Sequence, residues 1–229
     1  MAIILNIETS GSICSVCIAD NGTLLSEATG KTENDHAAQL TNLIDEALQG
    51  AGKGMKNLNA VAVSGGPGSY TGLRIGVSTA KGICHALNIP IIHIPTLQAM
   101  SVGALTFAKK AKLFCPLIDA RRDEVFTAVY SEQAAEVLPP QSLILSEAFF
   151  RQFENKDSIV FFGSGLLKSR PLIKMRNAVL LEDYFHRSAF LSGLSNEKFR
   201  AGQFENLAYY EPYYLKPVYT TTKNSTEKQ

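Results

Sequence analysis

"NIETSGSICSVCIAD" at residues 6–20 decides the fold, because its pattern returns as "LIDARRDEVFTAVYS" at residues 117–131. The two stretches align without a gap and place Asp119 on Glu8. Each reads as a buried strand that ends in a carboxylate, then a tight polar turn and a strand with alternating side chains. Strand–turn–strand units are common enough to recur by chance, but the carboxylate at the same strand end favours an internal duplication.

The segments around the first copy predict a hairpin, two helices and a partly parallel sheet. An Asn-Gly pair at residues 21–22 suits the hairpin turn that follows the first copy. A helix is expected at residues 35–49, where apolar side chains recur on one face, and another from about residue 70 to residue 88. The second helix lies between strands expected at residues 58–64 and 89–94, which makes a βαβ unit.

The second half is predicted to repeat this plan in a shorter form. After its hairpin we expect a helix at 146–154, a strand at 158–163, a weak strand at 178–181 and a helix near 188–203. Two copies of a strand, hairpin, helix and βαβ unit, each opening with an acidic strand end, describe the architecture of actin, hexokinase and Hsp70. We therefore predict an α/β, actin-like fold, a duplicated ribonuclease H-like design with mixed sheets and a shortened second half.

Composition limits the classes of partner and location. The chain has 229 residues, 45% of them hydrophobic, and 22 Lys and Arg against 21 Asp and Glu, so nothing demands a nucleic acid or an anionic membrane as its sole partner. The opening "MAIILNIETS" has no basic region, and no window approaches about 18 uninterrupted apolar residues. We expect neither a signal peptide nor a membrane helix, and a cytoplasmic location.

Cysteines and histidines do not form a recognisable metal site. Cys14 and Cys17 have the spacing of half a zinc site, but they lie on a strand, where residues three apart point to opposite faces. Buried thiols in a reducing cytosol are the favoured interpretation of all four cysteines. The four histidines show no metal-ligand spacing. We expect no metal and no cofactor.

The glycine-rich stretch "SGGPGSYTGLRIG" at residues 64–76 matches no standard phosphate loop. It lacks the lysine of a P-loop, and three residues rather than two separate its last pair of glycines in "GPGSYTG", which rules out the dinucleotide pattern. Ser69 does not stand in the GxSxG pattern of a nucleophile elbow. Backbone N–H groups at the start of the following helix remain able to attract an anion.

The helix that follows this loop repeats small residues, Gly72, Gly76 and Ala80, every four positions. Each glycine costs about 1 kcal/mol in a helix interior, so the pattern predicts that another backbone approaches closely. The helix also carries two apolar stripes, one suited to its own sheet. The second stripe is Ile75, Thr79, Ile83 and Ala86. Either the helix at 35–49 covers it, or both helices form a docking surface.

Several stretches together resemble the TsaB family, also called YeaZ, which is similar to the glycoprotease group. They are "LNIETSGSICSVCIADNG", "DHAAQLTNLID", "GGPGSYTGLRIGVSTAKGICHAL", "PLIDARRDEVFTAVY" and "EPYYLKP", and the resemblance runs from residue 3 to about residue 217. It implies a first actin-like subdomain at 1–107 that carries the partner-binding helices, a degenerate second subdomain at 108–217, and a polar tail at 218–229.

The resemblance implies a non-catalytic subunit that binds and supports TsaD. TsaD transfers threonylcarbamoyl to N6 of the adenosine next to the tRNA anticodon. The partners implied are TsaD in a heterodimer and the ATPase TsaE, with a homodimer when the chain is alone and tRNA contacted only through the complex. The alternative is a small actin-like ATPase or kinase that uses Glu8, Asp119 and the glycine loop. A metalloprotease is disfavoured, because His93 lacks the second histidine of the HxxxH motif of TsaD-type proteins.

The resemblance places partner binding on the helices at 35–49 and 70–87. The expected partner-binding residues are His36, Leu40, Leu43, Tyr70, Gly72, Leu73, Arg74, Gly76, Val77, Ala80 and Cys84. The nucleotide-binding candidates are Glu8, Thr9, Ser10 and Asp119, and no catalytic residue is expected. For the two carboxylates we favour turn capping, in which they accept backbone hydrogen bonds. Surface charge is favoured over tRNA contact for a basic set, Lys109, Lys110, Lys112, Arg121 and Arg122.

Overall fold

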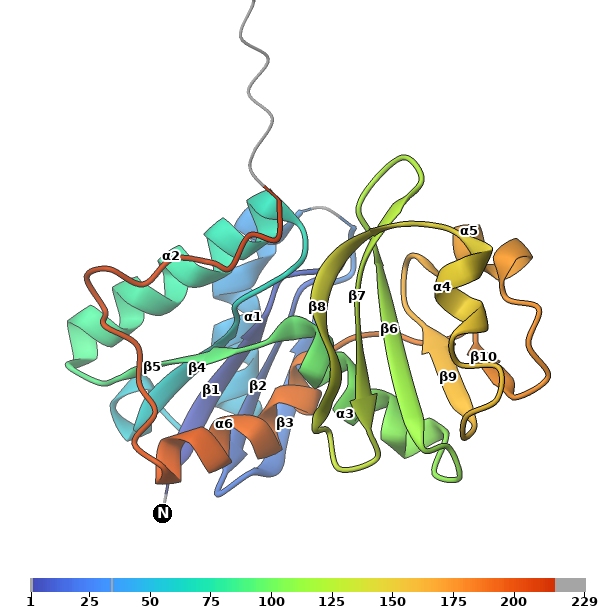
Figure 1. Ribbon diagram of the computed structural model, residues 1–229. Helices are drawn as coiled ribbons and strands as arrows, with labels where there is room; N and C mark the ends of the chain where they lie inside the picture. Colours follow the sequence, from blue (N-terminus) through green and yellow to red (C-terminus); the bar gives the residue numbers. More distant parts are fainter. Residues whose placement is uncertain (1, 34, 217–229) are drawn as a thin grey trace, which may run out of the picture.

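Two mixed five-stranded sheets form the frame of the computed structural model, which describes residues 2–33 and 35–216 (Figure 1). The first sheet has the order β3-β2-β1-β4-β5, and the second has the order β8-β7-β6-β9-β10. The strands of the first sheet are β1 (Ile3–Glu8), β2 (Ser15–Asp20), β3 (Thr23–Thr29), β4 (Ala60–Ser64) and β5 (Ile91–Ile94). Those of the second are β6 (Leu113–Asp119), β7 (Glu124–Ser131), β8 (Glu136–Ile144), β9 (Ile159–Phe162) and β10 (Ala178–Leu181).

The two sheets share one topology, which confirms the predicted duplication. In each, the first three strands are antiparallel neighbours, and the fourth and fifth strands run parallel to the first. The central strands β1 and β4 read as apolar runs because helices cover both of their faces, so they are buried on both sides.

The gapless alignment of the two copies is wrong by one residue beyond the turn. Glu8 pairs with Ser15 across the first hairpin, whereas Asp119 pairs with Val125 across the second. Five residues therefore separate the paired Asp119 and Val125, one fewer than the six that separate Glu8 and Ser15. Turn length sets the register of a hairpin, so strand β7 is displaced by one position while Asp119 keeps the place of Glu8.

Helices α1 (His36–Gly50) and α2 (Tyr70–Leu87) cover one face of the first sheet, and α6 (Ser192–Arg200) covers the other (Figure 1). In the second half the corresponding helices are only α4 (Glu147–Arg151) and α5 (Leu166–Ser169), so the predicted shortening is confirmed. Short 3₁₀ turns complete the described elements at Met55–Asn57, Arg170–Leu172 and Ser188–Leu191. No helix in the described part of the chain is both long and apolar enough to cross a membrane.

Helix α3 (Thr96–Phe107) joins the two halves and was not expected from the sequence. Its Leu97 and Met100 pack into the core of the second sheet, while Ala99 packs into that of the first. A helix with apolar residues all round shows no single stripe, which is why periodicity does not reveal it.

The end of the described chain returns to the first half. The 3₁₀ turn Ser188–Leu191 and helix α6 contact strands of the first sheet, and Leu191 lies in its core. Residues 188–216, expected within the second subdomain, thus pack largely on the first. The expected polar tail at 218–229 lies outside the described residues.

All four cysteines are buried and free, as the interpretation of Cys14 and Cys17 as ordinary thiols requires. Burial raises the pKa of the Cys17 thiol to about 11, because an apolar surrounding disfavours the thiolate.

Candidate partner surface and interdomain cleft

A cleft of about 920 Å³ separates the opening turns of the two halves. The first half contributes residues 10–13 and the glycine loop, residues 67–71, to its walls. The second half contributes residues 118–122 and a Gly163-Ser164 turn. The duplicated hairpins therefore face each other, as the fold predicts.

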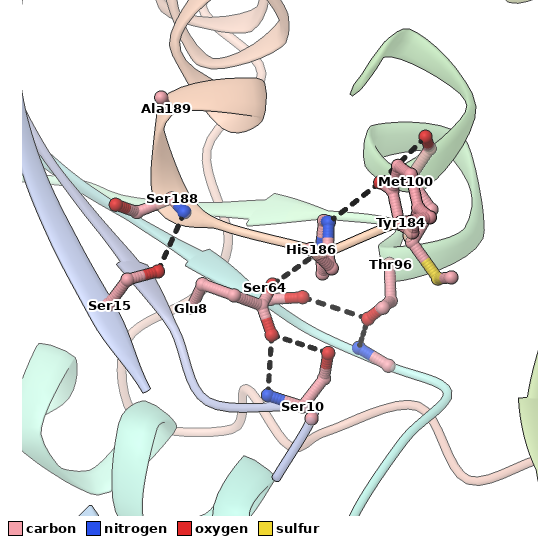
Figure 2. A network of polar contacts seen from close by, with 12 residues as sticks. Glu8, Ser10, Ser15, Ser64, Thr96, Met100, Tyr184, His186, Ser188 and Ala189 are labelled. Carbon is pink, nitrogen blue, oxygen red and sulfur yellow. Dashed lines mark hydrogen bonds and ion pairs between the residues drawn. The ribbon is translucent and has the colours of Figure 1, made fainter. Parts of the chain in front are cut away.

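The carboxylate of Glu8 is buried beneath this cleft and is fully engaged (Figure 2). Its Oε2 lies 2.7 Å from His186 Nε2, and its Oε1 accepts hydrogen bonds from the backbone N–H, at 2.6 Å, and the hydroxyl of Ser10. Burial alone would raise the pKa of Glu8, but His186 and hydrogen bonds from Ser10 and Ser64 lower it to about 2. Glu8 is held as a structural anion.

His186 forms the wall between Glu8 and the cleft. It lines the cleft, whereas Glu8 does not, and its Nδ1 lies 3.4 Å from the hydroxyl of Tyr184. That hydroxyl in turn donates to the carbonyl oxygen of Met100 on α3 at 2.8 Å (Figure 2). His186 follows strand β10, far from Glu8 in the sequence, and no local motif indicates that the two residues meet.

Asp119 occupies the matching strand end in the second half but is half-exposed. Its Oδ1 accepts the backbone N–H of Arg121 at 2.7 Å and the ammonium of Lys168 at 2.7 Å. Partial desolvation raises the pKa of Asp119, but Lys168 and the Arg121 N–H more than offset this and lower it. Asp119 thus caps its turn as Glu8 caps the first, through the N–H two residues ahead. The predicted turn-capping role is confirmed for both carboxylates.

The four nucleotide-binding candidates do not converge on the cleft. Ser10 and Asp119 line it, but Glu8 and Thr9 are buried below its surface. Glu8 and Asp119 do not face each other across the cleft, because His186 stands in front of the Glu8 carboxylate, and the disfavoured reading of the two as an acid–base pair finds no support.

The glycines of α2 allow a close backbone approach, but the approaching backbone is the chain's own. A Cβ atom on Gly72 would lie 2.1 Å from the Thr9 carbonyl oxygen, and one on Gly76 would lie 2.2 Å from Thr9 Oγ1. Gly82, two turns further on, has nothing within 4 Å of its Cβ position. The first two glycines seat the helix on the β1–β2 turn, and only the third faces open space.

Most of the expected partner-binding residues are buried by the chain itself. Apart from Tyr70 and Arg74, they lie on the buried faces of α1 and α2; they are His36, Leu40, Leu43, Gly72, Leu73, Gly76, Val77, Ala80 and Cys84. Arg74 lies over the Tyr70 ring at 4.5 Å, and its Nε donates to the Tyr214 hydroxyl at 3.4 Å. Most of the residues expected at the partner surface thus lie on the inner faces of α1 and α2, and partner binding by these helices stays a prediction.

The outer face of α2 carries four small residues beside Arg74 and His85. Its exposed residues are Thr71, Arg74, Ser78, Gly82, His85 and Ala86. The second apolar stripe lies at the edge of this face: Ile75 and Ile83 are half-buried against the core below. The chain therefore covers this stripe only in part, and the alternative of a docking surface made by both helices stays a prediction.

The basic set expected together is divided between two ends of the second sheet. Arg121 and Arg122 follow strand β6, while Lys109, Lys110 and Lys112 precede it. Seven extended residues separate the two groups by about 20 Å. Lys112 is also paired with Glu132 at 2.6 Å. These residues do not form one basic surface.

His93 is partly buried in the structure. Its Nδ1 lies 2.9 Å from the hydroxyl of Tyr210, and burial, helped by the charge of Lys198, lowers its pKa to about 4. Within residues 2–33 and 35–216, no three His, Cys, Asp or Glu side chains cluster as metal ligands.

Comparisons with known proteins give the family. The family model described as "TsaD: tRNA N6-adenosine threonylcarbamoyltransferase" matches residues 27–209. The chain is 29% identical to the tRNA threonylcarbamoyladenosine biosynthesis protein TsaB of Bacillus subtilis over 69% of each chain. It is 34% identical to the TsaB of Haemophilus influenzae over 54% of this chain and 51% of that one. The chain belongs to this family, in its TsaB (YeaZ) group.

Solved structures agree with the fold expected of a TsaB protein. YeaZ from Pseudomonas aeruginosa superposes with a TM-score of 0.80 at 24% identity, covering 94% of this chain and all of that one. The activator of 2-hydroxyisocaproyl-CoA dehydratase from Clostridium difficile, solved with bound ADPNP, superposes at 0.53 with 7% identity over 89% of this chain and 98% of that one. The predicted actin-like fold is confirmed.

The aligned parts of the TsaB relatives above span 51% to 69% of those proteins.

Proposed function

We propose that the chain is a non-catalytic subunit that binds TsaD and supports it in forming N6-threonylcarbamoyladenosine next to the tRNA anticodon. Membership of the TsaB group supports this role. The observation that carries the proposal is the outer face of α2, which lies beside α1 and exposes the small residues Ser78, Gly82 and Ala86. TsaE joins the pair in the cytoplasm, and tRNA is contacted through the complex.

The chemistry of this face suits a second helix pair. Small side chains such as Ser78, Gly82 and Ala86 let helix axes approach closely, near the lower end of the 8–10 Å usual for packed helices. The half-buried Ile75 and Ile83 supply apolar area at its edge. A partner that presents two helices would complete their burial, and a second copy of this chain would do so when TsaD is absent.

The state of Glu8 supports a subunit that does not perform the transfer itself. A carboxylate that acts as a general base must reach its substrate, within about 3 Å or through one water. Glu8 is 1% exposed and is engaged by His186 and Ser10. It has no path to a substrate in the cleft.

The alternative function is a small actin-like ATPase or kinase, favoured by the size of the cleft. The two proposals differ in the purified protein. As a supporting subunit, the chain alone should not hydrolyse ATP above a blank, and its removal from cells that make it should lower the N6-threonylcarbamoyladenosine content of tRNA. ATP turnover that Asp119→Asn abolishes would favour the alternative.

A further inference from the structure

Residues 208–216 form a strap that leaves a turn at residues 207–209 and runs antiparallel to α2 (Figure 1). Side chains alternate along it, with Tyr209, Glu211 and Tyr213 outward and Tyr210 buried. Lys81 of α2 anchors the strap at its start, since Nζ donates to the carbonyl oxygens of Ala208 at 3.2 Å and Tyr210 at 3.0 Å.

The middle of the strap contacts the glycine loop through its backbone. The N–H of Tyr213 donates to the Gly65 carbonyl oxygen at 2.7 Å. A Cβ atom on Gly66 would lie 2.3 Å from the Tyr213 carbonyl oxygen, and one on Gly65 would lie 2.6 Å from the Tyr210 hydroxyl. Gly66 is therefore needed for the strap to lie on the loop, whereas a side chain at Gly65 would first meet His93 Nδ1, at 2.0 Å.

The strap then passes from the first half to the second. The Tyr214 ring packs against Tyr70 with centroids 5.1 Å apart, and its hydroxyl accepts from Arg74. Two residues later Lys216 forms an ion pair with Glu124, the first residue of strand β7. Tyr213, Tyr214 and Lys216 all line the cleft. One segment thus joins α2 to the second sheet across the cleft mouth.

The two ends of the strap are held with unequal strength. At its start, Tyr210 is buried and its hydroxyl lies 2.9 Å from His93 Nδ1. At its end, the Lys216–Glu124 pair is about one-quarter exposed, and such pairs are weak and screened by salt. Regions with few buried contacts open first in a folded protein. Release should therefore begin at Lys216 and stop before Tyr210.

We propose that residues 208–216 are a releasable strap that ties the two halves together and sets the opening of the cleft. Two contacts form its clasp: Tyr214 packs on Tyr70 and Arg74 of α2, and Lys216 pairs with Glu124. The proposal goes beyond the proposed function, since it concerns the isolated chain and needs no partner.

Charge-reversal variants of the full-length chain test the strap. The readout is hydrogen–deuterium exchange at single amides. Lys216→Glu or Glu124→Lys alone should speed exchange at Tyr213 and in the cleft turns, residues 10–13 and 120–123, about two- to fivefold. The double exchange should restore slow rates. Equal rates in all four proteins, or fast exchange that the double variant keeps, would overturn the proposal.

Two matched tyrosine variants give an independent test, because they leave the residues of strand β7 unchanged. Tyr214→Ala should speed exchange at Tyr213 and the cleft turns about tenfold, because the ring contact with Tyr70 and the hydrogen bond from Arg74 are both lost. Tyr209→Ala removes an outward-facing ring from the same strap and should leave these rates unchanged. Identical exchange in the two variants would count against a clasp at Tyr214.

Discussion

Gly72 of α2 lies so close to Thr9 that a side chain cannot fit, because a Cβ atom would stand 2.1 Å from the Thr9 carbonyl oxygen. This contact places the β1–β2 turn under the first turns of α2. It explains why a helix accepts glycines that cost about 1 kcal/mol each. It also turns the opposite side of α2, with Ser78 and Gly82, toward solvent.

Two glycine-to-alanine substitutions in α2 should therefore change stability in opposite directions. Gly82→Ala should stabilise the fold by about 0.5–1 kcal/mol, since alanine favours a helix and the site is open. Gly72→Ala should destabilise it by about 1–3 kcal/mol, because the backbone of Thr9 must move. Urea unfolding of both variants checks the signs, and destabilisation by both would mean that Gly82 is not open.

Removal of His186 should destabilise the fold strongly. His186→Ala removes the imidazole 2.7 Å from the buried Glu8 carboxylate and leaves that charge uncompensated, which costs roughly 3–5 kcal/mol. Adding Glu8→Leu to His186→Ala should recover part of this loss, because no buried charge is then left unpaired. Denaturant midpoints measure both effects. If His186→Ala changed the free energy of unfolding by less than about 0.5 kcal/mol, the contact between His186 and Glu8 would contribute little to stability.

Acid should remove the contribution of Glu8 in a defined pH window. The folded pKa of about 2 lies below the ordinary value of 4.5, so between these values the unfolded state binds more protons. Stability from this group is present above pH 4.5 and is lost as the pH falls through 2. Glu8→Gln should flatten that part of the stability–pH curve. An unchanged slope would contradict the assigned pKa.

His93 should remain neutral well below the usual histidine range. Its folded pKa of about 4 lies below the ordinary 6.5, mainly because of burial, so its contribution to stability declines as the pH falls through this window. Proton NMR of the imidazole can follow the titration. Lys198→Gln should raise the pKa only part of the way toward 6.5, because the charge of Lys198 is the smaller cause. Complete recovery would assign the shift to charge instead of burial.

The duplicated topology could be predicted from sequence because it depends on local patterns. The two acidic strand ends, the Asn21-Gly22 turn and the apolar strands each leave a signal within a few residues, and the structure bears them out. Helix α3 has no such local signal, because it is apolar on all sides and is buried between the two sheets.

The candidate site depended on distant contacts and was predicted less well. Glu8 meets His186, and Gly72 meets Thr9, only after the chain has folded. A glycine repeat predicts that another backbone approaches α2 closely, but it does not tell whether that backbone belongs to a partner or to the chain itself. For this reason the sequence analysis assigned to a partner surface several side chains that the chain itself buries.

The most direct measurement of the central claim, that the outer face of α2 binds TsaD, is the affinity of two matched arginine variants for purified TsaD. Gly82 and Gly193 are both exposed helical glycines with nothing within 4 Å of the Cβ position, one on α2 and one on α6. Gly82→Arg should abolish the shift in elution volume on mixing with TsaD and weaken binding at least a hundredfold by calorimetry. Gly193→Arg should bind like the unaltered chain. Equal binding by both variants, with both folded, would contradict the assignment of this face.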